Sequence, residues 1–316
     1  MAIADNSQRK LKLAGKVPLG MRLKAWWDGY ELEVHRRLVA DDSGSGHEVR
    51  YERERLAWET PRIELAQQLW GQGFNSPGEA EQTRDLVKPV GLDESMSVLE
   101  IGAGLGGSAR LIAQEFGSWV TALEPNAGLA QAGAALSEMS GLSRKASVTG
   151  CDMENLEIKR AGYDCILARQ ALFAVDNKLG ALAAMANGLK AKGQLIITDF
   201  VKGETAGRAF QQWRNAEASK GEPWSPEDYA DTIKELGLDL RVAADVTADY
   251  RAALVEGWSG FMADVGKQKF DADQAQTVKE EAEFWSLRKA ALDSGELRIY
   301  RFHALSTRAN KLLSDW

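Results

Sequence analysis

The sequence predicts an α/β protein: a Rossmann-like, seven-stranded, mostly parallel sheet with helices on both faces, plus an N-terminal α-helical extension. Three observations predict it. Apolar runs typical of buried strands alternate with helical patterns from about residue 97 onward, as a parallel sheet flanked by helices requires. A glycine-rich turn follows the first of these runs. The length of 316 residues suffices for one large α/β domain with appendages.

The N-terminal quarter of the chain predicts helices separated by turn-forming residues. An Asp/Ser/Gly cluster at 41–46 breaks the first helix, and Pro61 fits the first turn of a later one. Helices are expected over residues 19–40, 50–58, 63–70 and 77–87. We therefore divide the chain into an N-terminal helical extension, 1–75, and a main domain, 76–316.

The main domain alternates strand and helix signals along its whole length. Strands are expected over residues 97–101, 119–124, 146–150, 163–168, 194–200, 239–246 and 297–305. Helices are expected over residues 107–115, 127–139, 178–189 and 226–236. Two further helical insertions fall near 202–225 and 248–294.

The composition excludes several functional classes. A formal charge of −7 argues against a nucleic-acid binder, which would normally present a basic surface. The two cysteines and three histidines form no cluster with metal-ligand spacing, so no metal site is expected. No apolar run approaches the roughly 20 residues that cross a bilayer, and lysines interrupt any signal-peptide pattern near the N-terminus. We expect a cytoplasmic protein.

Residues 98–110 carry the most informative motif, a buried strand that leads into a glycine-rich turn and then a helix. Gly102 and Gly104 permit a tight turn and a close approach of backbone to ligand, while Gly106 and Gly107 open the helix. Such a motif alone is equally compatible with a nicotinamide or flavin cofactor.

Acidic residues at consecutive strand ends narrow this choice. Glu100 lies where it would face the amino group of a methionine moiety but would repel a pyrophosphate. Glu124 could accept hydrogen bonds from ribose hydroxyls, and Asp152 with Met153 could contact adenine. Any one of these acids could instead be a helix cap, but together they predict S-adenosylmethionine. The expected cofactor-binding residues are Glu100, Gly102, Gly104, Gly106, Gly107, Glu124, Pro125, Asp152, Met153 and Ala168.

These motifs resemble the class I S-adenosylmethionine-dependent methyltransferases, in particular the phosphoethanolamine/sarcosine/sterol-type small-molecule group. Further stretches that carry the resemblance are residues 70–78, 168–175, 195–200, 245–250 and 284–289. The resemblance implies a last strand that inserts antiparallel, a lid formed by the segment before the core, and a segment after the fourth strand that lies under the transferable methyl.

The chain departs from the family pattern at the catalytic positions. Phe74 and Ala174 stand where phosphoethanolamine methyltransferases have a tyrosine and a histidine, and Gln170 stands where they have an aspartate. Residues 216–224 replace the Arg- and Tyr-bearing stretch with which those enzymes bind their phosphorylated substrate. The resemblance therefore implies the fold and the cofactor, but not phosphoethanolamine as the substrate.

The expected acceptor pocket is apolar and aromatic. Burial lowers the pKa of an amine and favours its neutral, nucleophilic form, and aromatic rings could hold a methylated cation. The same aromatics could instead be core packing, where aromatic residues are common. The expected pocket residues are Trp70, Phe74, Phe173, Trp213, Trp224 and Tyr250, and the catalytic candidates are Arg169, Gln170 and Asp199.

The expected function is methyl transfer to a small molecule, foremost an amine nitrogen of a metabolite or lipid headgroup. Alternatives are a C- or O-methyltransferase of a hydrophobic acceptor, such as a quinone, sterol or polyketide-like compound, and a non-catalytic S-adenosylmethionine-binding protein. Six basic residues and no acidic one lie between residues 6 and 24, which suggests a peripheral membrane contact or merely a solvated tail. A homodimer also stays open.

Overall fold

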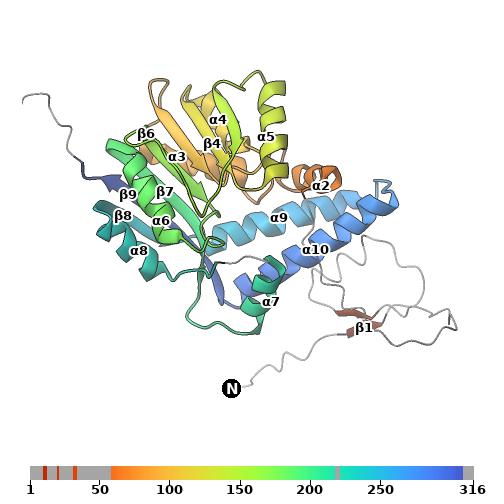
Figure 1. Cartoon of the computed structure of the whole chain (residues 1–316). Helices are drawn as coiled ribbons and strands as arrows, with labels where there is room; N and C mark the ends of the chain where they lie inside the picture. Colours follow the sequence, from red (N-terminus) through yellow and green to blue (C-terminus); the bar gives the residue numbers. More distant parts are fainter. Residues whose placement is uncertain (1–9, 13–19, 21–30, 34–57, 218–220, 309–316) are drawn as a thin grey trace, which may run out of the picture.

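The computed structural model describes residues 10–12, 20, 31–33, 58–217 and 221–308. One seven-stranded sheet forms the body of the molecule, with helices on both of its faces (Figure 1). Its strands are β3 (Ser97–Ile101), β4 (Trp119–Glu124), β5 (Ala146–Gly150), β6 (Tyr163–Arg169), β7 (Leu189–Lys202), β8 (Leu238–Asp245) and β9 (Leu297–Ser306). The α-helices are α2 (Thr60–Trp70), α3 (Glu79–Val87), α4 (Gly107–Glu115), α5 (Ala127–Met139), α6 (Lys178–Gly188), α7 (Arg208–Glu217), α8 (Pro226–Glu235), α9 (Thr247–Val265) and α10 (Ala272–Asp293).

The strand order is β5-β4-β3-β6-β7-β9-β8. Neighbouring strands from β5 to β7 are parallel, while β9 is inserted antiparallel between β7 and β8. The predicted fold class is confirmed, including the antiparallel last strand. Because the parallel strands all end at one edge of the sheet, the turns that follow β3, β4 and β6 meet there.

Side chains of the central strands alternate between two apolar cores. In β3, Val98 packs in the core under α3 and α4, whereas Leu99 and Ile101 pack in the core under α6 and α8. All three are at most 1% exposed. A strand buried on both faces reads as a continuous apolar run, which is why the sequence predicts its bounds correctly.

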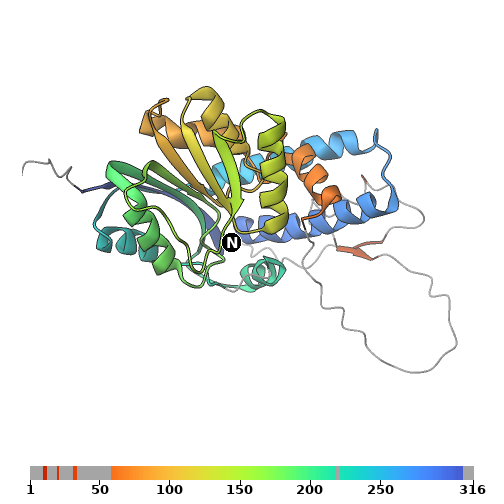
Figure 2. The same cartoon turned by 45° about the horizontal axis from the view of Figure 1, so that its top comes forward.

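A third apolar core lies beyond the sheet, among α2, α7, α9 and α10. Figures 1 and 2 show α9 and α10 extending past the sheet, and α2 contacts both of them. The helical insertion expected over 248–294 is two helices. The first ends at Val265 with Gly266 as its C-cap, and Asp271 caps the second through a reciprocal capping box with Gln274.

Within the first predicted N-terminal helix, over 19–40, the structure describes Gly20, which is helical, and residues 31–33, where the prediction is wrong. Residues Glu31–Glu33 form strand β2, which pairs in parallel with β1 (Lys10–Lys12). Both segments alternate polar and apolar residues, a period of two that favours a strand. Of the expected helix over 50–58, only Trp58 is described, and it is not helical. The remaining residues of both helices lie outside the described part.

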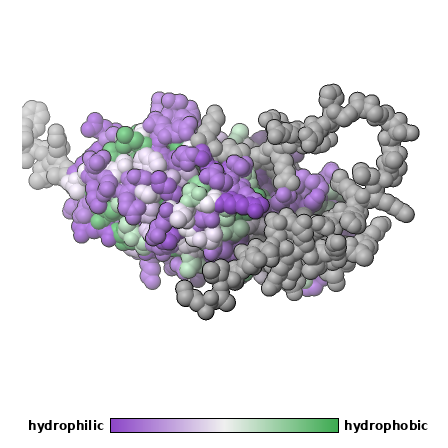
Figure 3. Space-filling view, turned by 90° about the horizontal axis from the view of Figure 1, so that it is seen from below, coloured by the Kyte–Doolittle hydropathy of each residue, from purple (hydrophilic) through white to green (hydrophobic). Residues whose placement is uncertain are grey.

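The face drawn in Figure 3 is mainly hydrophilic, with only smaller apolar areas. Among the described helices, none combines the length and the apolar character that a bilayer-spanning helix needs.

Candidate functional site

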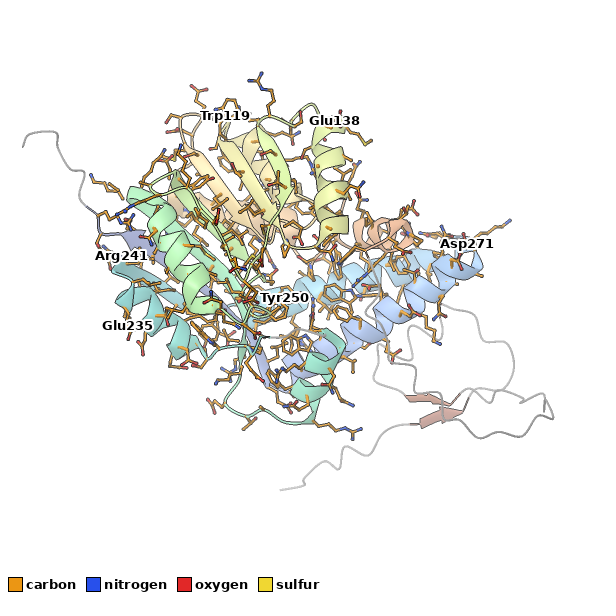
Figure 4. All side chains as sticks on the ribbon, in the orientation of Figure 1. Trp119, Glu138, Glu235, Arg241, Tyr250 and Asp271 are labelled. Atoms are coloured by element: carbon orange, nitrogen blue, oxygen red, sulfur yellow. The ribbon has the colours of Figure 1, made fainter. Side chains whose placement is uncertain are left out.

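A cavity of about 360 Å³ opens at the carboxyl edge of the sheet. One end lies under the glycine-rich turn between β3 and α4. The other lies between the sheet and helices α7, α9 and α10. Figure 4 marks Tyr250, one of its lining residues, near the centre of the molecule where α9 meets the sheet. We call these the turn end and the helix end of the cavity.

The turn after β3 needs glycine because other parts of the chain approach its backbone closely. Gly102 has a φ of +75°, and a Cβ there would lie 2.7 Å from the Cβ of Ala171 and 2.8 Å from the carbonyl oxygen of Arg169. Gly104 has a φ of +55°, and a Cβ there would clash with the Asn75 side chain. Glycine therefore lets this backbone form the cavity wall.

Glu124 stabilises the same turn from the end of β4. One carboxylate oxygen accepts a hydrogen bond from the backbone N–H of Gly104 at 2.7 Å, and the other from that of Asn126 at 2.8 Å. The side chain is buried, and burial raises its pKa despite these two donors. Each oxygen keeps a lone pair for a ligand hydroxyl.

Glu100 brings a second buried carboxylate to the turn end of the cavity. It is 1% exposed and accepts a hydrogen bond from the Ser108 hydroxyl on α4. Glu100 and Glu124 come from adjacent parallel strands and both line the cavity. Two buried acceptors at one end suit a ligand that carries an ammonium group and hydroxyl groups.

The remaining predicted cofactor residues occupy various positions. Pro125 lines the cavity, while Gly106 and Gly107 cap and begin α4, and Ala168 pairs with Ile101 inside the sheet. Asp152 and Met153 do not line it. Asp152 is exposed and accepts hydrogen bonds within its own turn, from the Glu154 backbone and the Asn155 side chain. Met153 is buried in the core under α6.

Two of the three catalytic candidates, Arg169 and Gln170, line the cavity after β6. Arg169 is 4% exposed and donates to the Thr83 hydroxyl at 2.9 Å. Gln170 has a φ of +42° and donates to the Thr198 hydroxyl at 3.0 Å. Neither side chain can accept a proton from a substrate, so both can only orient one.

Asp199, the third candidate, does not reach the cavity. It alternates along β7 with Phe200, which does line the cavity, so its carboxylate points to the opposite face. There it is fully buried and accepts a hydrogen bond from the Tyr229 hydroxyl at 2.6 Å. Burial raises the pKa of Asp199 to about 7. The structure therefore gives it a place in the core under α8.

Of the six predicted pocket residues, Phe173 and Tyr250 line the cavity and the other four do not. Trp213 lies one layer behind, with its ring centroid 5.8 Å from Phe173. Trp224 packs on Tyr229 on the other side of the sheet. Aromatic content alone does not tell which face of the molecule such a ring occupies.

The other two expected pocket residues, Trp70 and Phe74, lie at the end of α2 and just after it. The Trp70 ring lies 4.8 Å from that of Trp285. Phe74 covers Gly107, where a Cβ would come within 2.6 Å of its ring. From α2 and the residues on either side of it, Trp58, Arg62, Asn75 and Ser76 line the cavity.

Most of the helix end was not predicted from the sequence. Its lining includes Phe200 from β7, Glu217 from α7, and Phe284, Trp285 and Arg288 from α10. A signal was present in α10, because residues 281, 285 and 288 follow the spacing of one helix face. That face could not be assigned to the cavity from its periodicity alone.

Two buried ion pairs border the cavity. Arg288 donates to Glu217 from both Nε, at 3.1 Å, and Nη2. Arg62 pairs with Glu281 at 2.7 Å, and both side chains are 5% exposed. Within the described part of the chain, no three His, Cys, Asp or Glu residues gather as metal ligands would. The cavity thus presents carboxylates at one end and aromatic rings with neutralised charge at the other.

Comparisons with known proteins agree with this geometry. A family model described as a methyltransferase domain matches residues 78–242. Phosphoethanolamine N-methyltransferase 1 of Zea mays is 22% identical over 234 residues, which cover 73% of this chain and 46% of that protein. The Plasmodium falciparum phosphoethanolamine N-methyltransferase is 24% identical over 196 residues, covering 61% of this chain and 72% of that protein. The chain thus spans about half the length of the maize relative.

One solved structure shares the fold over most of the chain. Haemonchus contortus phosphoethanolamine N-methyltransferase 2, in complex with S-adenosyl-L-methionine, superposes with a TM-score of 0.68 at 20% identity. The match covers 78% of this chain and 57% of that one.

Proposed function

Since the chain belongs to the family of methyltransferase domains, we propose that it transfers a methyl group from S-adenosylmethionine to an amine nitrogen of a small molecule. One observation carries the proposal: two buried carboxylates, Glu100 and Glu124, line a cavity beneath a glycine turn that allows close backbone approach. The relatives are named for N-methylation, which supports an amine as acceptor.

The residues of the turn end fit S-adenosylmethionine chemically. Glu124 would accept hydrogen bonds from ribose hydroxyls, and Glu100 would face the ammonium of the methionine moiety. Gly102 and Gly104 line the cavity and carry no side chain of their own, so their backbone could lie against the ligand. S-adenosylmethionine, when bound, supplies an electrophilic methyl group on a sulfonium.

The chain itself contributes alignment and desolvation. Methyl transfer is an in-line displacement, so fixing the acceptor lone pair on the line of methyl carbon and sulfur can supply most of the acceleration. Gln170 and Arg169 line the cavity and can orient the acceptor there. The rings of Phe173 and Phe200 exclude water from the helix end. In such surroundings the pKa of an amine falls, which favours its neutral, nucleophilic form.

Turnover tests the proposal. Purified full-length protein would be incubated with methyl-labelled S-adenosylmethionine and panels of amines, aminolipids, phenols and quinones. Label transferred to an amine supports N-methylation. Transfer only to an oxygen or a carbon would instead favour the alternative of a hydrophobic acceptor, for which the aromatic helix end is equally suited. Binding of S-adenosylmethionine without transfer to any class would favour a non-catalytic binding protein.

A peripheral membrane contact and a homodimer are further parts of the proposal. The basic segment over 6–24 supports the contact, since lysine and arginine clusters are attracted to anionic lipid. Most of that segment lies outside the described residues. Deleting residues 1–24 should abolish sedimentation with anionic vesicles, and unchanged sedimentation would remove the idea. Analytical ultracentrifugation of the full chain decides between monomer and dimer.

A further inference from the structure

A permanent cation occupies the helix end of the cavity. The Arg288 guanidinium carbon lies 4.4 Å from the ring centroid of Trp285, 4.9 Å from that of Phe284 and 5.0 Å from that of Phe200. Arg288 itself is only 8% exposed. Aromatic faces around a guanidinium are the arrangement that would otherwise hold a ligand ammonium. In this protein, the side chain of Arg288 occupies the space among these aromatic rings.

Glu217 neutralises this cation from within the chain. Its carboxylate is 1% exposed, accepts two hydrogen bonds from Arg288, and accepts another from the Trp213 indole at 2.8 Å. The hydroxyl of Tyr250 accepts a further hydrogen bond from Arg288, from Nη1 at 3.3 Å. Burial alone lowers the pKa of Arg288, but the Glu217 carboxylate holds it above its usual value. Three hydrogen bonds from Arg288 are therefore directed to partners within the chain.

This pairing decides which acceptors the cavity can hold. A buried guanidinium is a strong binding site for phosphate or carboxylate when its donors face the ligand. Here an anionic group on the acceptor would have to displace Glu217 or lie beside its negative charge, and such repulsion is strong where water is excluded. Arg62, which also lines the cavity, is likewise matched by a carboxylate, that of Glu281.

We propose that Glu217 is a specificity-determining residue that excludes acceptors carrying a phosphate or carboxylate, so that the acceptor class is an amine without an anionic group. This inference rests on the proposed amine methylation and narrows it. It separates this chain from the relatives named for phosphoethanolamine. Glu217 lies in the helical insertion before β8, outside the motifs that hold the cofactor.

Calorimetric binding of phosphoethanolamine and of inorganic phosphate tests the proposal on full-length protein loaded with S-adenosylhomocysteine. Wild type should bind neither at millimolar concentration. The Glu217→Gln variant removes the charge that satisfies Arg288, and should gain at least tenfold in affinity for phosphoethanolamine. Glu222→Gln is the matched control, because Glu222 is an exposed glutamate paired with Arg214 nearby. It should gain nothing.

The double variant Glu217→Gln/Arg288→Met keeps the test decisive if the single variant does not fold, since it removes both members of the pair. It should bind phosphoethanolamine no better than wild type. Binding of phosphoethanolamine by wild type, no gain in a folded Glu217→Gln, or a gain in the double variant would each overturn the proposal. Failure of the proposed function differs, because it shows as no binding of S-adenosylhomocysteine or as no methyl transfer to any amine.

Discussion

At the scale of single residues, Glu124 contributes both to the fold of the β3–α4 turn and to the candidate site. Its two oxygens accept the backbone N–H groups of Gly104 and Asn126, so the same carboxylate shapes the turn and faces the cavity. A glutamine offers only one acceptor oxygen and would set its amide N–H₂ against one of these donors. The charge and the turn geometry are therefore lost together.

We expect Glu124→Gln to raise the KM for S-adenosylmethionine at least tenfold, which corresponds to about 1.4 kcal/mol of binding free energy. Initial rates at varied S-adenosylmethionine check this. Glu138→Gln is the control, since Glu138 is exposed on α5, well away from Tyr250 in Figure 4. Equal KM values for the two variants would remove Glu124 from the site.

Protonation of the Asp199 carboxyl affects the stability of the folded protein. Its pKa in the folded protein, about 7, lies above the ordinary value of 3.8, because the carboxyl is fully buried. The folded state therefore holds this proton more tightly than the unfolded state. Its contribution to stability is greatest below pH 4, falls as the pH rises from 4 to 7, and stays constant above 7.

The measurement is the free energy of unfolding of wild type and Asp199→Asn at several pH values. Over pH 4 to 7, wild type should lose about 1.4 kcal/mol per pH unit relative to the variant, as one group with a raised pKa requires. Other carboxyls titrate in both proteins and cancel in the difference. Parallel stability curves would show that Asp199 does not titrate in this range.

At the scale of elements, the site depends on the β3–α4 turn meeting the loop after β6. A Cβ at Gly102 would press on the backbone of Arg169 and on Ala171, neither of which can move like the end of a flexible side chain. We expect Gly102→Ala to weaken S-adenosylhomocysteine binding more than tenfold in equilibrium dialysis. Gly91→Ala has the same backbone strain, with a φ of +67° and open space around it. Gly91→Ala should bind S-adenosylhomocysteine with normal affinity. Equal losses of affinity in the two variants would show that backbone strain alone weakens binding.

The buried pair Arg62–Glu281 links helix α2 to helix α10. Removing one partner leaves a buried charge unmatched, so Arg62→Met should cost about 3 kcal/mol of unfolding free energy in urea. Adding Glu281→Gln should recover part of this loss, because it removes the unmatched charge. Arg84→Met, in an exposed pair with Glu115, should change stability little. A cost for Arg62→Met no larger than that of Arg84→Met would contradict the role of the pair.

The sequence predicted elements well where the signal is local. Strands β3, β4 and β5 match their expected bounds, because each is a short apolar or alternating run between turn residues. The expected strand 194–200 is really β7, which begins at Leu189. Its first residues include Lys190, Lys192 and Gly193, which are not typical of a buried strand. The sequence therefore did not predict that β7 begins so early.

At the scale of the whole molecule, the two ends of the cavity differed in how far they could be predicted. Glu100 and Glu124 lie near the carboxyl ends of β3 and β4, and the glycines come directly after β3. These residues meet at one edge of the sheet because the strands are parallel. The helix end is built by α7, α9 and α10, which lie far along the chain and meet only through tertiary packing. Hence Glu217 and Arg288 were missed, while Trp213 and Trp224 were expected to line a pocket that they do not reach.

The account as a whole depends on the cavity holding S-adenosylmethionine. Calorimetric titration of the full-length protein with S-adenosylmethionine tests this most directly. The account predicts saturable binding of one molecule per chain. Absence of saturable binding would contradict both the assignment of the cavity and the methyl transfer built on it.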